Sequence, residues 1–332
     1  MINRLAIVAI AWLGSCALAP SAFALDKITV GYFTEWPLPV EFAKGAGLFE
    51  KEMGVELKWV PFDTGTAMNA AMASGDVQIG VSLGLPAFVN AVSAGQDLKA
   101  IGISVSYAAN EGCAIRKDLE FDPKNVSELK GRKVAVPVGT AAQYSFIKQM
   151  EYLKVPVDSL NVVDMAPPDG AAALSQGAVD IACGWGGSWK RMKEYGDVMV
   201  DPATKEKVGI YIVDIFSTTS SFANEHSDLL TKFMAVTEKA TKMWNSGQHK
   251  SEMLPVIAKE SGLDEASAGA QLDTFQILDA KTQLSQKWLG GGIQEFMKGI
   301  ANVFVASGSI KAPLPDYNST IDKTFLTAVS KE

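Results

Sequence analysis

Three acidic residues stand where a carboxylate could bind a cation. Asp214 interrupts an otherwise apolar, strand-like run, IYIVDIF, while Glu111 lies in NEGCAIRK and Glu35 lies in FTEWP. Carboxylates in these positions could bind the ammonium group of a small ligand. The alternative for each is an ordinary surface or hinge carboxylate, which is the commoner fate of an acidic residue in a loop.

Two predicted helix starts, at Pro86 and at Thr140, could supply the opposite chemistry. The first turn of a helix leaves backbone N–H groups without partners and carries the positive end of the helix dipole, so it can bind an anion. Ser82, Thr140 and Gln143 could add side-chain donors. The phosphate-loop pattern GxxxxGK(S/T) does not occur. A sulfonate would suit such a site, because it stays anionic and offers three acceptor oxygens.

Aromatic residues could form the walls of the same site. Trp36, Trp185 and Trp189 are the candidates, and an aromatic face attracts an ammonium by about 0.5–2 kcal/mol. Trp185 lies in the glycine-rich run GWGGSW after a predicted strand, at the strand end where α/β proteins form ligand sites. Trp189 could equally be the packing face of the following helix, and Tyr144 fits either a pocket or the core.

The N-terminus is typical of a secretory signal peptide. Arg4 precedes an apolar stretch at residues 5–14, and residues 22–24 match the small-x-small cleavage rule. We therefore expect cleavage after Ala24 and export across a bacterial inner membrane to the periplasm. The alternative is lipoprotein processing, with lipidation of Cys16.

The mature chain is predicted to be a soluble protein of 332 − 24 = 308 residues, enough for two compact lobes. Its net charge becomes −7 − 1 = −8 when Arg4 is removed, which favours solubility rather than a polyanionic partner. Basic residues do not alternate with aromatic ones in any run, so the sequence predicts no nucleic-acid binding.

Catalytic and metal chemistry have little support in the sequence. His226 and His249 do not assemble with a nucleophile into a catalytic set, and no GxSxG motif occurs. We predict no catalytic residue, no cofactor and no metal site. Cys113 and Cys183 remain in the mature chain and both lie in strand-like segments. An exported protein could join them in a disulfide, and two buried free thiols are the alternative.

A ten-residue pattern that occurs twice indicates how these side chains are positioned. AMASGDVQIG at residues 71–80 and ALSQGAVDIA at 173–182 each read as the end of a helix, a glycine and a short buried strand. Gly75 and Gly177 fit left-handed helix caps. Two similar α/β units about a hundred residues apart predict two similar lobes, and proteins of this kind usually bind a ligand between them.

The alternation of strands and helices along the chain predicts an α/β protein with mostly parallel sheets. The pattern restarts after about a hundred residues, and a later strand-like run could cross back into the first lobe. We therefore predict a hinge of two crossing strands at 108–111 and 213–217. The predicted domains are 25–108 with 217–332 as lobe 1, and 109–216 as lobe 2, after the signal peptide at 1–24.

Three runs of the sequence, DTGTAMNAAMASGDVQIG, GRKVAVPVGTAAQYS and PPDGAAALSQGAVDIACGW, carry a resemblance. The chain resembles the taurine-binding periplasmic proteins of ABC importers, which share a broader group with binding proteins for alkanesulfonates and nitrate. The similarity runs from about residue 28 to about residue 320. It implies a bilobed type II periplasmic-binding-protein fold that closes on its ligand and docks on a membrane permease.

The resemblance also implies roles for particular residues. Taurine-binding members carry an acidic residue in the first hinge strand, where Glu111 stands, and an aspartate in the returning strand, where Asp214 stands. Their tryptophan after the second repeat strand corresponds to Trp185. Their helix start at the site corresponds to Thr140 and Ala141.

Four positions depart from the family's pattern. Gly84 and Leu85 replace a Ser–Ser pair that opens the helix after the first repeat, and Gln143 replaces a histidine. Trp36 stands where the family has a small residue.

These observations together predict a monomeric solute-binding protein of an ABC importer. Its ligand is expected to be taurine or a closely related aminosulfonate or sulfonate, bound between the lobes. One alternative is a binding protein for a plain anion, an alkanesulfonate or nitrate. An enzyme on the same fold, similar to pyrimidine-precursor synthases, and a sensor module are the others.

Overall fold

The computed structural model describes residues 25 and 27–331. The predicted signal peptide, with its cleavage site and the alternative lipidation at Cys16, lies outside the described residues. Within them, no helix is both long and apolar enough to cross a lipid bilayer.

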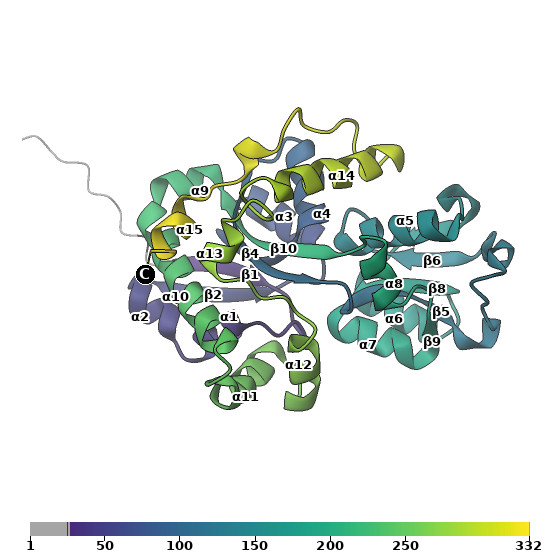
Figure 1. Ribbon diagram of the computed structural model, residues 1–332, viewed down its shortest axis with the longest axis horizontal. Coiled ribbons are helices and arrows are strands. Elements are labelled where there is room, and N and C mark those ends of the chain that lie inside the picture. Colours follow the sequence, from purple (N-terminus) through teal and green to yellow (C-terminus); the bar gives the residue numbers. More distant parts are fainter. Residues whose placement is uncertain (1–24, 26, 332) are drawn as a thin grey trace, which may run out of the picture.

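Two five-stranded mixed sheets form the centres of two lobes, and Figure 1 shows them side by side. The first sheet has the order β2-β1-β3-β10-β4, and its strands are β1 (Lys27–Tyr32), β2 (Glu56–Pro61), β3 (Ile79–Gly84), β4 (Leu98–Tyr107) and β10 (Ile212–Thr219). The second has the order β7-β6-β8-β5-β9, and its strands are β5 (Glu111–Arg116), β6 (Lys133–Val136), β7 (Asn161–Asp164), β8 (Ile181–Trp185) and β9 (Gly196–Val198).

The two sheets follow the same plan. In the first, β1 pairs in parallel with β2 and β3, and β10 runs antiparallel between β3 and β4. In the second, β6 pairs in parallel with β7 and β8, and β5 runs antiparallel between β8 and β9. The predicted bilobed α/β fold is therefore confirmed. Residues 212–219 form β10 of the first sheet, so the chain has already returned to the first lobe before residue 212. The exact domain boundaries stay a prediction.

Helices cover both faces of each sheet. Those of the first lobe are α1 (Pro39–Gly45), α2 (Leu48–Met53), α3 (Gly65–Ala73), α4 (Leu85–Ser93), α9 (Ser220–Glu225), α10 (Ser227–Asn245), α11 (Lys250–Ser261), α12 (Glu265–Leu272), α13 (Ala280–Gln283), α14 (Gly292–Ala306) and α15 (Thr324–Val329). Those of the second lobe are α5 (Ala141–Leu153), α6 (Pro167–Ser175), α7 (Gly186–Tyr195) and α8 (Pro202–Lys207).

The repeated ten-residue pattern forms the same element in both lobes. It contains the end of α3, Gly75 and the start of β3 in the first lobe, and the end of α6, Gly177 and the start of β8 in the second. Gly75 has φ 83° and Gly177 has φ 71°, a left-handed conformation that glycine adopts without strain. The sequence signal thus marks equivalent strands of the two lobes.

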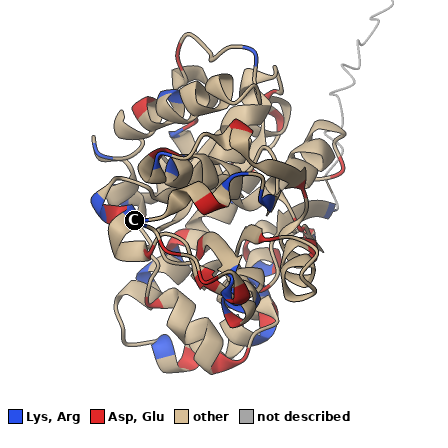
Figure 2. Cartoon of the chain, turned by 90° about the vertical axis from the view of Figure 1, so that its right-hand side faces the viewer, with Lys and Arg blue, Asp and Glu red and all other residues tan. Residues whose placement is uncertain are grey.

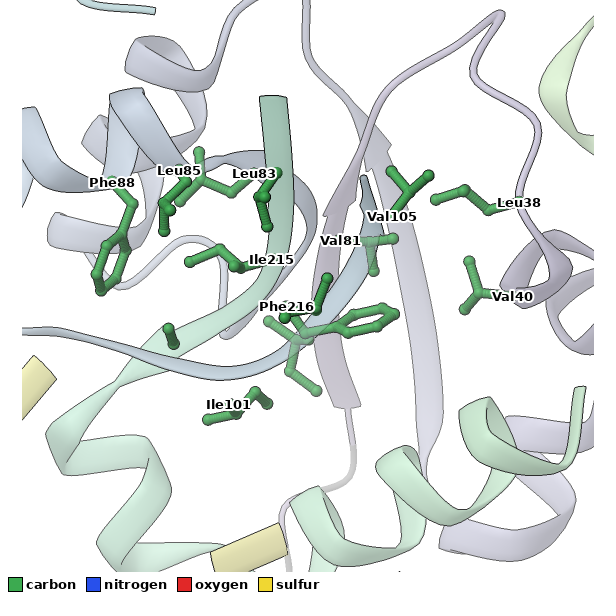
Figure 3. Packing of buried hydrophobic residues seen from close by; sticks show 14 of the residues in the cluster. Leu38, Val40, Val81, Leu83, Leu85, Phe88, Ile101, Val105, Ile215 and Phe216 are labelled. Atoms are coloured by element: carbon green, nitrogen blue, oxygen red, sulfur yellow. The ribbon is translucent and has the colours of Figure 1, made fainter. Parts of the chain in front are cut away.

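Each lobe has its own hydrophobic core. Figure 3 shows part of the first, where Val81 and Leu83 of β3 lie with Ile215 and Phe216 of β10. The second lobe has smaller clusters, one around Val134, Ile181 and Phe146 and another around Trp189 and Met192. On the face in Figure 2, acidic and basic residues are interspersed, so no large region carries one sign of charge.

Cys113 and Cys183 form a disulfide in the second lobe. They are directly opposite each other on the antiparallel strands β5 and β8, and each is 1% exposed. The bond closes a loop with a sequence separation of 70 residues, and cross-links of this kind stabilise a fold by about 2–4 kcal/mol. Of the two alternatives left open by the sequence, the structure has the disulfide.

Candidate ligand-binding cleft

A cavity lies between the two lobes, beside the strands that cross from one to the other. Eight of its lining residues belong to the first lobe and three, Thr140, Ala141 and Trp185, to the second. The first-lobe residues are Phe33, Trp36, Gly65, Ser82, Gly84, Ala87, Tyr107 and Asp214. A ligand in this cavity would therefore touch both lobes.

Among the residues that the structure describes, Asp214 is the one acidic residue of this lining, and no lysine, arginine or histidine lines the cavity with it. Its side chain is 4% exposed; Ser82 Oγ donates to Oδ2 at 2.9 Å and Tyr107 donates from its hydroxyl to Oδ1 at 3.3 Å. Burial raises the pKa of Asp214 to about 8, and the negative charge of Glu111 adds to this, although the two hydrogen bonds oppose it. Burial thus favours the protonated form of Asp214, and a nearby cation would favour the carboxylate.

A β-bulge aims Ser82 at Asp214. Ile215 pairs with Leu83 and Ser217 pairs with Gly80, so Val81 and Ser82 together oppose a single residue of β10. Ser82 has φ 60°, an uncommon conformation for a residue other than glycine.

The Ser82 hydroxyl is fully engaged in this position. It accepts from Trp36 Nε1 at 2.9 Å and from Ser104 Oγ at 3.2 Å, and it donates to Asp214. The local backbone is therefore held in a strained conformation by a buried hydrogen-bond network that ends on the carboxylate.

Two helix N-termini from opposite lobes meet at the cavity. Helix α4 begins after Gly84 and helix α5 begins after Thr140, and neither first turn is capped by a side chain. The Thr140 hydroxyl instead donates to the carbonyl of Pro137 at 2.6 Å. A Cβ atom on Gly84 would lie 3.3 Å from Ala141 Cβ and 3.5 Å from Asp214 Oδ1, so the two helix starts converge beside the carboxylate.

Four aromatic side chains complete the lining. Trp36 and Tyr107 pack edge-on with ring centroids 4.9 Å apart. Phe33 and Trp185, which come from opposite lobes, also meet edge-on, at 6.2 Å. Tyr107 is buried, and its pKa is raised well above the usual value, mainly by that burial and also by the charge of Asp214.

Seven of the thirteen predicted site residues line this cavity: Trp36, Ser82, Gly84, Thr140, Ala141, Trp185 and Asp214. Phe33, Gly65, Ala87 and Tyr107 also line it but were missed. Tyr107 had a usable signal, since it is a polar aromatic residue at the end of an apolar strand just before the crossing. The other three look like ordinary core or helix residues in the sequence.

The structure does not bring Glu111 to the cavity lining. Its side chain is 1% exposed and forms an ion pair with Lys205, which is equally buried. Ser145 donates to the same carboxylate oxygen, Oε1, at 2.9 Å. Glu111 therefore already has a cation of this chain as its partner, which argues against its predicted role in binding a ligand's ammonium.

Four further candidates also lie outside the lining. Leu85 is buried in the core, and Trp189 donates from Nε1 to the carbonyl of Ala109 at 3.1 Å. Gln143 Oε1 accepts from the backbone N–H of Gly139 at 2.7 Å. Tyr144 is buried and packs edge-on against Phe296, at a centroid distance of 6.0 Å. In the structure these four residues pack against other side chains or bond to the backbone, and they do not line the cavity.

Glu35 joins the lobes beside the cavity rather than within it. Arg191 of α7 donates from Nη1 to Glu35 Oε1 at 2.9 Å, and both side chains are partly exposed. The Glu35 carboxylate also occupies the space that a Cβ atom would need at Gly187, in the first turn of α7. This contact exists only when the lobes are together.

We expect Arg191→Met to favour the open form, because it removes this ion pair and keeps much of the apolar stem. An exposed pair contributes up to about 1 kcal/mol, so ligand affinity should fall by at most about fivefold. Small-angle scattering of the ligand-free protein should show a larger radius of gyration. Arg132→Met is the matched control, since Arg132 pairs with Asp180 within the second lobe. Equal effects of the two substitutions would contradict a role in closure.

Comparison with known proteins identifies a family and similar proteins. The NMT1/THI5-like family profile matches residues 38–247. The taurine-binding periplasmic protein of Escherichia coli (strain K12) is 24% identical over 316 residues, which cover 93% of this chain and 96% of that protein.

Solved structures share the fold at lower identity. The alkanesulfonate-binding protein SsuA from Xanthomonas axonopodis pv. citri, bound to MOPS, has a TM-score of 0.72 at 18% identity, covering 90% of this chain and 99% of its own. The desulfurization enzyme DSZB has a TM-score of 0.60 at 14% identity, covering 92% and 99%. Binding proteins and an enzyme thus occur on the same architecture.

Proposed function

This chain belongs to the NMT1/THI5-like family, and on that premise we propose that it is the periplasmic solute-binding protein of an ABC importer. We propose further that its ligand is a small zwitterion, taurine or a close aminosulfonate, held between the lobes. The observation that carries the proposal is the position of Asp214. This buried carboxyl has no basic side chain beside it among the described residues of the cavity lining, and it lies next to two uncapped helix starts.

The charges of the cleft favour a zwitterion over a plain anion. A plain anion could bind beside Asp214 only while this carboxyl stays protonated, because no basic side chain among the described lining residues offsets repulsion from the carboxylate, and it would gain no charge pairing there. A zwitterion brings its own cation for Asp214 and offers its sulfonate to the N–H groups of α4 and α5. Hydrogen bonds to a charged group contribute roughly 1.5–3 kcal/mol each.

Closure of the lobes would be the response to the ligand. Contacts from Asp214 in one lobe and the start of α5 in the other are available together only in the closed form. Moving the protein from mostly open to mostly closed requires roughly 5.5 kcal/mol of differential binding. A ligand that spans the cavity could supply it, and an importer's permease would then recognise the closed form.

The residues that line the cavity support ligand binding rather than catalysis. Of the described residues, those around the cavity include no histidine and no cysteine. Its hydroxyls are engaged, since Ser82 and Tyr107 donate to Asp214 and Thr140 donates to a carbonyl. We therefore propose no reaction for this site.

Calorimetric titration of the mature protein with taurine and with isethionate tests the proposal. Isethionate has a hydroxyl where taurine has its amine, so it isolates the contribution of the cation. We expect isethionate, short alkanesulfonates and nitrate to bind at least thirtyfold more weakly than the best aminosulfonate. If isethionate binds as tightly as every aminosulfonate, the plain-anion alternative is correct.

A further inference from the structure

Aromatic rings make up a large part of the cavity lining, and two of them are tied to Asp214. Phe33, Trp36, Tyr107 and Trp185 all line it, together with the Asp214 carboxylate. The Trp36 ring is held in place because its N–H is bonded to Ser82 and the ring packs edge-on with Tyr107. Trp185 reaches Phe33 from the other lobe, so the ring of aromatic groups is complete only when the lobes are together.

The side-chain acceptors next to Asp214 are already partly used. Each oxygen of Asp214 already accepts one hydrogen bond, from Ser82 or from Tyr107, and keeps one lone pair. The Tyr107 hydroxyl, which donates to Asp214, can still accept. The Ser82 hydroxyl itself accepts two bonds and donates one, so it has no lone pair to spare. A primary ammonium carries three N–H donors, so it must reach acceptors on both Asp214 and Tyr107 at once, and a buried donor without a partner costs roughly 1–3 kcal/mol.

Alkyl groups on the nitrogen remove this problem. An N-methyl group needs no acceptor, spreads the positive charge over its surface and can lie against aromatic faces, which attract cations of this kind. A tertiary ammonium would keep a single N–H for Asp214 and present its methyl groups to the rings. The lining thus fits an alkylated nitrogen better than a bare ammonium.

We propose that the ligand of this cleft carries an N-alkylated ammonium, and that the protein prefers N-methylated aminosulfonates to taurine. The proposal rests on the function proposed above, because it assigns the substituents of the same cation. It makes Trp185 and Trp36 residues that determine specificity, while Asp214 supplies the charge.

Titration with a methylation series tests the preference directly. Taurine, N-methyltaurine, N,N-dimethyltaurine and N,N,N-trimethyltaurine share one sulfonate and differ only at the nitrogen. We expect N,N-dimethyltaurine to bind at least tenfold more tightly than taurine at pH 7.5. Taurine binding as tightly as, or more tightly than, every methylated member would overturn the proposal.

A pair of ligands without a sulfonate separates this inference from the proposed function. If neither taurine nor any methylated member binds, the proposed function fails. Ethylamine and N,N-dimethylethylamine, each at millimolar concentration, then still report on the nitrogen site. Tighter binding of the dimethylated amine supports the inference, while equal or weaker binding, or no binding of either amine, overturns it.

Trp185→Leu tests whether the aromatic ring causes the preference, because leucine keeps an apolar side chain and removes the π-system. The ratio of the taurine Kd to the dimethyltaurine Kd should fall to about threefold or less. Trp59→Leu is the matched control, since Trp59 is also half-buried but lies on β2 outside the cavity. An unchanged ratio in Trp185→Leu would contradict the role of the ring. Should that variant not fold, the wild-type methylation series decides.

Discussion

Replacement of Asp214 by asparagine is expected to abolish most ligand binding. Asparagine keeps the shape of the side chain and can still accept a hydrogen bond from Ser82 or Tyr107, but it removes the charge that an ammonium requires. Truncating one partner of a buried, hydrogen-bonded charge pair costs about 2–5 kcal/mol. We therefore expect the Kd, measured by calorimetric titration, to rise at least thirtyfold.

The wild-type protein should show a pH dependence that Asp214→Asn lacks. In the empty cleft the pKa of Asp214 is about 8, so below pH 8 the carboxyl is mostly protonated. Binding of a cation requires the carboxylate and releases this proton. Affinity should therefore rise with pH, by at most tenfold per unit, up to about pH 8 and then level off.

Proton release can be measured by itself. At pH 7, titrations in buffers of different ionisation enthalpy should show about one proton released per ligand bound, and none for Asp214→Asn. Lys44→Met is a suitable control for a general charge effect, because Lys44 lies outside the cavity and pairs with Glu41. Affinity independent of pH between 6 and 8 in the wild type would show that Asp214 does not receive the cation.

Replacement of Lys205 by methionine is expected to lower the free energy of unfolding by about 3–5 kcal/mol, because it leaves Glu111 buried without its cation. Both side chains are 1% exposed, and Lys205 donates to the backbone carbonyl of Glu111 as well as to its carboxylate. Urea unfolding, followed by circular dichroism, provides the measurement. The two residues connect the start of β5 with α8, which leads back to the first lobe.

Two controls make this result interpretable. Lys27→Met breaks an exposed pair with Glu56 and should cost less than about 1 kcal/mol. The double substitution Glu111→Leu with Lys205→Met removes both charges and should recover most of the lost stability. If Lys205→Met is no more destabilising than Lys27→Met, the buried pair is not an important element of this lobe.

The sequence predicts the architecture well because local signals determine it. Alternating strands and helices, and two glycines that must adopt positive φ, lead directly to two similar sheets. Gly75 and Gly177 confirm this, since both have the left-handed conformation that their position after a helix requires. Asp214 is equally visible, because a carboxylate inside an apolar strand needs an explanation.

The remaining features of the cleft depend on contacts between distant residues. Nothing near Glu111 in the sequence shows that Lys205, 94 residues later, neutralises it. The bulge that turns Ser82 toward Asp214 arises from the register of β3 against β10, which no short window of sequence reveals. Tyr107 becomes a site residue only because β4 pairs with β10 and brings its hydroxyl to the carboxylate.

The disulfide between Cys113 and Cys183 makes the redox state of the compartment part of the protein's maturation. The bond holds together the strands that begin with Glu111 and end with Trp185, so it supports one wall of the cleft. Cytosolic reductants keep thiols reduced, whereas the oxidising bacterial periplasm allows disulfides to form. In a chain exported as we propose, the cross-link would form only after translocation, so the shape of this wall of the cleft would depend on oxidation of the two thiols in the periplasm.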